Sequence, residues 1–201
     1  MRTPRVFRVL IGCALVAVIA LPVAPALAGI PAGRYAIGDS VMLGARDDLI
    51  ARGFRVNAQI SRQFRDVAPL VRELSEDGVQ INVTALFTTA QVELITAALK
   101  DGAPSYVSVF AGRIADAGID PLAIMSKSLD VLSEAPRSEL IWASPREILN
   151  VVQADQIGCH IITLTQDLLP KLDSLGKDLD QFSLETVQMF HRDAHNAGFV
   201  L

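Results

Sequence analysis

Apolar runs alternate with amphipathic segments of helical length from residue 81 to the end of the chain. Four of these runs have the length of buried strands, and they are residues 81–87, 106–110, 140–143 and 160–163. Each is followed by a segment with helical spacing of its apolar residues, such as 89–99 after the first run. Strands that alternate with crossover helices form parallel sheets. The pattern therefore predicts an α/β fold built from repeated βα units.

Two shorter βα units precede these four. Residues 35–37 and 55–58 are expected to be strands, and residues 41–52 and 64–75 are expected to be helices. One shared sheet and two separate sheets both fit this arrangement. Four units cannot close an eight-stranded barrel, so the open sheet edges of the C-terminal part favour a homo-oligomer.

Four sequence blocks carry a resemblance to a known family. They are N-V-T-A-L-F-T at 82–88, V-S-V-F-A-G-R-I-A-D at 107–116, I-W-A-S-P-R-E at 141–147 and G-C-H-I-I-T-L-T at 158–165. In this order they resemble the C-terminal half of a bacterial transaldolase or fructose-6-phosphate aldolase. The resemblance implies a partial (β/α)8 barrel of the TIM type, sugar phosphates of pentose phosphate metabolism as substrates, and a lysine Schiff base as the intermediate. It implies no cofactor.

The resemblance assigns roles to individual residues. Thr84 matches the strand threonine beside the Schiff base, Arg113 and Arg146 match cationic phosphate-binding positions, and Ser144 matches a phosphate-contacting serine. Phe110 stands where the single-domain aldolases have a catalytic tyrosine. Residues 144–147, Ser-Pro-Arg-Glu, also have the pattern of a capping box with proline at the first helical position. Both roles of Ser144 are open, because helix capping and phosphate binding use the same N–H donors.

Lysine is missing at the position where the family has its Schiff-base residue. That lysine precedes the N-V-T-A block in the family, whereas the first lysine of this chain follows the block, at position 100. All four lysines are predicted to lie on helices or beside them in contact with solvent, and they are Lys100, Lys127, Lys171 and Lys177. A Schiff-base lysine needs a desolvated position. We therefore expect no Schiff-base lysine here and an impaired aldolase.

A second resemblance lies nearer the N-terminus. G-D-S-V-M-L-G at 38–44 resembles the first block of the SGNH (GDSL-like) hydrolases and acyltransferases, which implies that Ser40 is a nucleophile. Such a serine needs a basic imidazole and an acid that orients it. The histidines are at positions 160, 191 and 195, within the transaldolase-like part, and the family's D-x-x-H block is not present. The alternative functions are an exported SGNH-type esterase or O-acyltransferase fragment and a non-catalytic fusion product.

Residues 1–28 have the composition of a secretory signal. They contain three arginines, no acidic residue, an apolar run over 9–21, and alanine at positions 26 and 28, so we expect cleavage after residue 28. The uncharged span 9–30 is long enough to cross a bilayer, so an uncleaved membrane anchor is the alternative. The signal predicts a periplasmic protein, whereas the transaldolase resemblance predicts a cytoplasmic one.

Basic residues change in type near residues 76–80. Every basic residue before this point is arginine, whereas four of the eight after it are lysine. The chain is therefore predicted to comprise a signal peptide (1–28), an SGNH-like N-terminal fragment (29–78) and a transaldolase-like half barrel (79–201). A gene fusion, a recombination event and an assembly error would each produce this organisation.

Charge and cysteine usage limit the partners that the chain can take. The net charge is −4, and loss of the three arginines of the signal leaves 15 basic and 22 acidic residues, or −7. No basic face is expected, so neither nucleic acid nor an acidic membrane is a predicted partner. Removal of Cys13 leaves Cys159 alone, and we expect it to be a buried thiol. His191 and His195 share a helix face without an apparent third ligand, so no metal site is expected.

Overall fold

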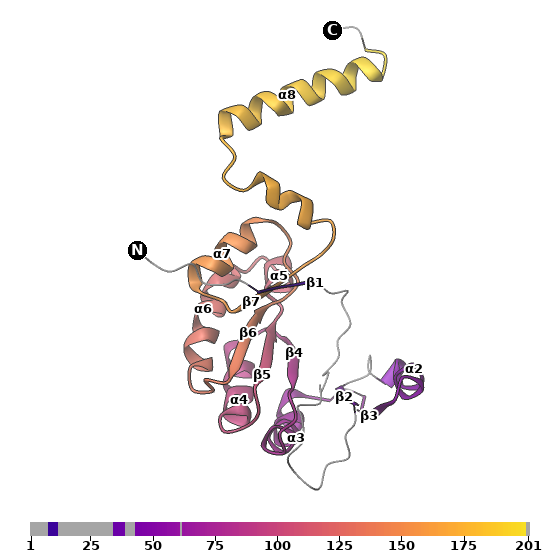
Figure 1. Cartoon of the computed structure of the whole chain (residues 1–201), viewed down its shortest axis with the longest axis vertical. Helices are drawn as coiled ribbons and strands as arrows, with labels where there is room; N and C mark the ends of the chain where they lie inside the picture. The colour runs from indigo at the N-terminus through magenta and orange to yellow at the C-terminus, as the bar shows by residue number, and fades with distance from the viewer. Residues whose placement is uncertain (1–7, 12–33, 39–42, 61, 200–201) are drawn as a thin grey trace. The chain divides into compact units, whose positions relative to one another are not determined.

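The computed structural model of the 201-residue chain describes residues 8–11, 34–38, 43–60 and 62–199 (Figure 1). The chain divides into two compact units, Met1–Thr165 and Gln166–Leu201, and each is described by itself. Ser40 and most of the predicted signal, residues 1–7 and 12–28, lie outside the described residues.

Five strands of the described chain form a parallel sheet, the main sheet, in the order β1-β7-β6-β5-β4. Their bounds are Arg8–Ile11 (β1), Asn82–Leu86 (β4), Ser105–Val109 (β5), Ser138–Trp142 (β6) and Ile161–Leu164 (β7). β5 and β6 pair in continuous register, from Ser105 opposite Ser138 to Val109 opposite Trp142. The predicted α/β fold with a parallel sheet of βα units is confirmed.

Strand β1 falls inside the predicted signal. It pairs with β7 from Arg8 opposite Ile161 to Ile11 opposite Leu164. The β-branched residues Val9 and Ile11 suit a strand, but this pairing was not among the predictions from the sequence. Cleavage after residue 28 stays a prediction.

Helices follow or flank the strands of the main sheet, and in the described chain they are α3 (Phe64–Glu76), α4 (Thr89–Leu99), α5 (Ala111–Asp116), α6 (Pro121–Leu132) and α7 (Leu149–Ile157). A capping box starts α4, since Thr88 Oγ1 accepts from the Gln91 N–H at 3.3 Å and Gln91 Oε1 accepts from the Thr88 N–H at 3.1 Å. At the start of α6, the carboxylate of Asp120 accepts from the Leu122 N–H at 2.9 Å. These caps satisfy N–H groups that have no partner within the helix.

The core lies on one face of the main sheet. Strand residues pack there against α4, α6 and α7, and they include Val83, Val107, Val109, Leu140, Trp142 and Ile162. Trp142 is the largest side chain of this core and is 0 % exposed. A smaller cluster of Ile141, Ala143 and Ile161 forms on the opposite face, because successive side chains of a strand point to opposite faces.

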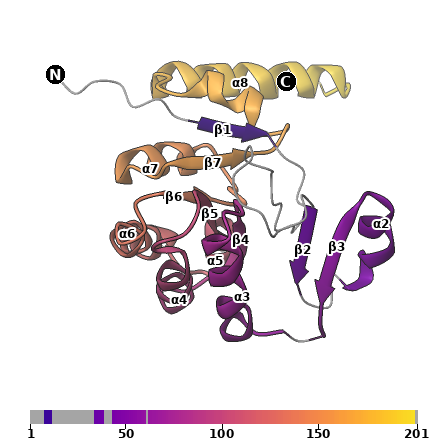
Figure 2. The same cartoon turned by 60° about the horizontal axis from the view of Figure 1, so that its bottom comes forward.

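The second and third strands of the chain, β2 and β3, form a sheet of their own (Figure 2). Strand β2 (Arg34–Gly38) pairs in parallel with β3 (Phe54–Ala58), and α2 (Arg46–Ala51) connects them. Ala36 and Leu49 are the buried centre of this small unit. Of the two arrangements left open by the sequence, the structure therefore has two separate sheets.

The second unit contains a 3₁₀ helix, η1 (Leu169–Ser174), and the long helix α8 (Leu179–Asn196). The helical segment predicted after the strand at 160–163 is a 3₁₀ helix in the structure. Pro170 lies in the first turn of η1, where a residue without an N–H group is tolerated. In the part of the chain that the structure describes, no helix combines the length and apolar character that a bilayer span requires.

The connection from α4 to β5 passes α3 at close range, and this contact can be tested. A Cβ atom added to Gly102 would lie 1.8 Å from Ser75 Oγ, 2.6 Å from Ser75 Cβ and 3.1 Å from the Ser75 carbonyl carbon. The Ala103 N–H donates to the Ser75 carbonyl oxygen at 2.9 Å, so separation of the segments would break a hydrogen bond. We expect Gly102→Ala to lower the free energy of unfolding by about 1–3 kcal/mol in urea denaturation.

Gly44→Ala is the matched control, because an added Cβ at Gly44 would meet no atom within 4 Å. It should change the free energy of unfolding by less than about 0.5 kcal/mol. Equal losses in the two variants would contradict the close contact at Gly102.

Candidate functional site

The carboxyl ends of β4, β5, β6 and β7 lie along one edge of the main sheet, because these strands are parallel. Polar residues follow each strand, namely Thr88 after β4, Arg113 after β5, Ser144 and Arg146 after β6, and Thr165 after β7. In sheets of this kind, ligands bind outside the carboxyl ends of the strands. The carboxyl edge is therefore the candidate site.

The loop after β5 contacts the loop after β6 through the backbone. The Gly112 N–H donates to the Ala143 carbonyl oxygen at 3.3 Å. A Cβ added to Gly112 would lie 1.5 Å from the Ser144 carbonyl oxygen and 2.6 Å from the Ser144 carbonyl carbon. Only glycine allows this approach, so Gly112 sets the distance between the two loops.

Ser144 does not cap a helix, so the predicted capping box at 144–147 is wrong. The residue has φ +58°, in the left-handed region, and α7 starts only after Ile148. Asn150, in the first turn of α7, instead holds the preceding loop, since its Oδ1 accepts from the N–H groups of Arg146 (2.8 Å) and Glu147 (3.3 Å). The Ser-x-x-Glu pattern at 144–147 ends before α7, which starts at Leu149.

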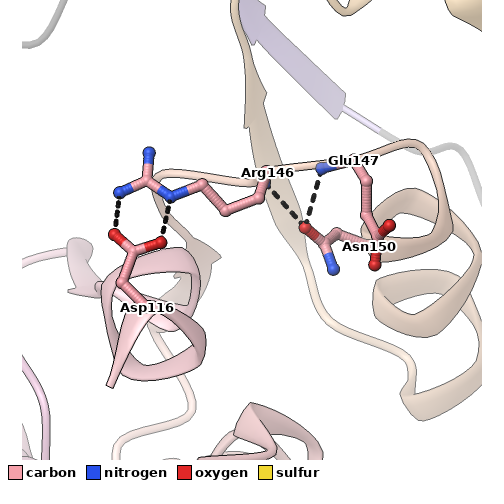
Figure 3. Close-up of polar contacts among 4 residues, drawn as sticks. All are labelled: Asp116, Arg146, Glu147 and Asn150. Carbon is pink, nitrogen blue, oxygen red and sulfur yellow. Dashed lines mark hydrogen bonds and ion pairs between the residues drawn. The ribbon is translucent and has the colours of Figure 1, made fainter. Parts of the chain in front are cut away.

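Arg146 forms an ion pair with Asp116, at the end of α5 (Figure 3). Arg146 Nε donates to Asp116 Oδ1 at 2.9 Å, and Arg146 Nη2 donates to Asp116 Oδ2. About half of each side chain is exposed, with 46 % for Arg146 and 51 % for Asp116. Exposed pairs contribute little to stability, so the pair matters chiefly because it fixes the direction of the guanidinium.

The two predicted phosphate-binding arginines share Asp116 as an electrostatic neighbour. The hydrogen bond from Arg146 lowers the pKa of Asp116, and the charges of Arg146 and Arg113 lower it further. Asp116 in turn raises the pKa of Arg146. The carboxylate is thus ionised at neutral pH, and the group of three charges has a net charge of +1.

Sequence reasoning missed Asp116 and Asn150. Each acts on the loop after β6, Asp116 from the end of α5 and Asn150 from α7. The available signals were an acidic residue close to Arg113 in the sequence and an asparagine within an amphipathic helix. Neither signal identifies a partner, because partners are set by the packing of the loops.

Thr84 lies on β4 and is half buried, and β5 separates it from β6 and its loop. The next residue, Ala85, has φ +64°, where the register between β4 and β5 shifts. The Phe110 ring lies 5.8 Å from the ring of Phe87, also at this end of β4 and β5. Thr84 and the arginines therefore lie on different strands or on the segments that follow them. At the position where the single-domain aldolases have a catalytic tyrosine, Phe110 contributes an apolar ring without a hydroxyl group.

All four lysines of the chain lie outside the strands. Lys100, Lys127 and Lys171 are exposed, as predicted. Lys177 differs, because its side chain is only 32 % exposed, pairs with Glu185 and lies 4.8 Å from the ring centroid of Phe182. An ammonium group that donates to a carboxylate has no lone pair available for attack on a carbonyl.

His160 and Cys159 have structural contacts at the start of β7. His160 Nδ1 accepts from the Leu140 N–H at 3.0 Å. The Cys159 thiol lies 3.5 Å from the Leu140 carbonyl oxygen and 3.4 Å from that of Ile161. The prediction that Cys159 is buried is confirmed, and burial raises its pKa to about 11.

Comparison with known proteins now identifies the family. Residues 64–201 match the family described as transaldolase/fructose-6-phosphate aldolase. The chain belongs to this family. A probable transaldolase of Nitrosopumilus maritimus is 36 % identical over 116 residues, which are 57 % of this chain and 50 % of that protein. One from Methanococcus maripaludis is 39 % identical over 103 residues, 51 % of this chain and 46 % of that protein.

A further relative, the probable transaldolase 2 of Listeria monocytogenes, is 37 % identical over 103 residues, or 51 % of this chain and 45 % of that protein. The chain thus spans about half the length of the curated transaldolases that it matches. The family match starts at residue 64 and includes α3, a helix predicted to belong to a fragment ending at residue 78. The boundary at 78/79 stays a prediction. These matches give no support to the SGNH resemblance around Ser40, which precedes the matched residues.

The buried thiol generates a prediction about reactivity. Since the thiolate is the reactive species, a pKa raised from 9.0 to about 11 lowers the reactive fraction of Cys159 about a hundredfold at pH 8. In a Cys13→Ser variant, an aromatic disulfide reagent should modify native Cys159 at least about a hundredfold more slowly than it modifies the same chain in denaturant. Similar rates in the two conditions would show that Cys159 is accessible.

Proposed function

We propose that this transaldolase-family chain binds a sugar phosphate at the carboxyl edge of its main sheet, with Arg113 and Arg146 as the cations that hold the phosphate group. This proposal rests on the positions of the two arginines. Arg113 lies on α5, directly after β5, and Arg146 lies in the loop after the neighbouring parallel strand β6, and both act on the single carboxylate of Asp116. Guanidinium groups bind phosphate oxygens with charge-assisted hydrogen bonds. Ser144 is a further candidate contact, because its loop is held against Gly112.

We also propose that the chain is impaired in Schiff-base catalysis. Thr84 is present on β4, but no lysine precedes it in the sequence. The four lysines lie on helices or beside them, and a nucleophilic amine needs a desolvated position from which it can lose its proton. The proposed activity is therefore binding of a sugar phosphate without aldol turnover.

The parallel sheet is proposed to be part of a (β/α)8 barrel. Among the strands that the structure describes, β4 pairs on one side only, with β5. An open strand edge is a surface for pairing with another chain, which supports the proposal of a homo-oligomer. The proposed ligand places the protein in sugar-phosphate metabolism, with the pentose phosphates as the expected compounds.

Export and the SGNH-type reaction remain predictions from the sequence alone. Ser40 and most of residues 1–28 lie outside the described residues. His160, one of the histidines considered as a base, uses Nδ1 to accept a backbone hydrogen bond. No observation at present favours the esterase or acyltransferase over the sugar-phosphate site.

The proposed site can be tested with fructose 6-phosphate and isothermal titration calorimetry. Arg113→Ala and Arg146→Ala should each raise the Kd about tenfold or more, because a hydrogen bond to a charged group contributes about 1.5–3 kcal/mol. Unphosphorylated fructose should bind far more weakly than fructose 6-phosphate to the unaltered chain. Equal affinities for the two sugars would contradict a phosphate site.

Arg137→Ala is the matched control for these variants. Arg137 immediately precedes β6, at the opposite edge of the sheet, and its Nη2 donates to the Asp101 carbonyl oxygen at 2.9 Å. This variant also removes one positive charge, yet it should leave the Kd unchanged. A loss as large as that of Arg113→Ala would mean that general charge, and no defined site, attracts the ligand.

Impaired catalysis predicts no covalent intermediate. On incubation with fructose 6-phosphate and sodium borohydride, a Schiff base is reduced to a stable secondary amine. We expect mass spectrometry to find no such adduct on any of the four lysines, whereas an intact transaldolase treated in parallel should be labelled. A stable adduct on one lysine of this chain would overturn the proposal.

A further inference from the structure

The backbone N–H and the guanidinium of Arg146 are both held in place by other residues. At the backbone, the Arg146 N–H donates to Asn150 Oδ1 at 2.8 Å. At the guanidinium, Nε and Nη2 donate to the two oxygens of Asp116. Figure 3 shows these contacts on opposite ends of the same residue, one from α7 and one from α5. A long and otherwise flexible side chain is therefore kept in one arrangement.

The Asp116 contact itself depends on the packing of the loops. Asp116 is at the end of α5, and Gly112, in the first turn of α5, meets the Ser144 carbonyl oxygen closely enough to exclude any side chain. The position of α5 relative to the loop after β6 is thus fixed by backbone contact. The carboxylate reaches Arg146 from a defined direction.

The bidentate contact with Asp116 uses one edge of the guanidinium, and another edge points away from the carboxylate. An arginine has five N–H donors in a planar fork, and Asp116 takes one on Nε and one on Nη2. Figure 3 shows the remaining nitrogen, Nη1, pointing away from Asp116. Nη1 and the second hydrogen of Nη2 form an edge that matches two oxygens of a phosphate monoester.

We propose that Asp116 is a positioning residue that presents this edge of Arg146 to the phosphate group of the ligand. The inference rests on the proposed sugar-phosphate site and assigns it a residue that the sequence did not reveal. Asp116 does not contact the ligand in this scheme. It orders the arginine before binding, so that the ligand does not have to immobilise a free side chain.

The opposite role, in which Asp116 competes with the ligand for Arg146, makes the opposite prediction. Asp116 adds one negative charge beside two positive ones. If it only weakened the attraction for an anion, its neutralisation would tighten phosphate binding. If it orients Arg146, its neutralisation weakens binding in spite of the more positive site.

The experiment is calorimetric titration of fructose 6-phosphate into the full chain and its variants. Asp116→Asn should raise the Kd about three- to tenfold, the range expected when one arginine must be ordered on binding. Asp116→Glu keeps the carboxylate and should stay within about threefold of the unaltered chain. Asp130→Asn, a change of the same kind on the exposed face of α6, should leave the Kd unchanged.

A double variant separates positioning from a general structural role. In an Arg146→Ala background, Asp116→Asn should produce no further loss of affinity, because the residue on which it acts is gone. A full additional loss in that background would overturn the proposal, as would tighter or unchanged binding by Asp116→Asn alone. Thermal unfolding of each variant shows whether it is folded. Because the ion pair between Arg146 and Asp116 is half exposed, we expect its loss to change the Tm little.

Failure of this inference is distinguishable from failure of the proposed function. If the unaltered chain does not bind fructose 6-phosphate, the sugar-phosphate site itself is wrong. If the unaltered chain binds it and Arg146→Ala weakens binding while Asp116→Asn does not, the site stands and only the role of Asp116 is wrong.

Discussion

The contact between Gly112 and the Ser144 carbonyl is the constraint on which the site depends. Parallel pairing of β5 and β6 places the two following loops at the same edge of the sheet, but pairing alone does not make the loops touch. The missing side chain at Gly112 lets α5 begin against the backbone of the next loop. That approach holds Ser144 in a left-handed conformation and brings Asp116 to Arg146. A strained backbone at such a position is typical of functional sites.

The two candidate capping boxes show what local sequence can and cannot predict. Thr88 and Gln91 form the box as expected, because β4 leads directly into α4 and the local pattern is undisturbed. Ser144 and Glu147 have the same pattern but do not form it. Contact with Gly112, distant in sequence, sets the backbone of Ser144, and Asn150 supplies the acceptor instead. Strands β2 to β7 and the burial of Trp142 and Cys159 follow from periodicity and polarity.

The sequence offered Arg113 and Arg146 as candidates because they match cationic positions of the family that the chain resembles. Arg113 and Arg146 are cations next to strand ends, and the structure places both at the carboxyl edge. Asp116 and Asn150 were not predictable, because an exposed acid and an amide have many possible partners and only the folded loops select one. The strand β1 was hidden for a similar reason, since an apolar run near the N-terminus fits a signal as well as a strand.

Anion binding and carbonyl chemistry place different demands on cationic side chains. Arginine binds phosphate while it keeps its charge, so partly exposed positions such as that of Arg146 are adequate. A lysine that forms a Schiff base must lose its proton first, which requires burial away from carboxylates. Of the four lysines only Lys177 is partly buried, and it forms an ion pair with the carboxylate of Glu185. On the proposed function, ligand binding and the covalent step depend on different residues and on opposite protonation requirements, so binding of a phosphate does not require the covalent step.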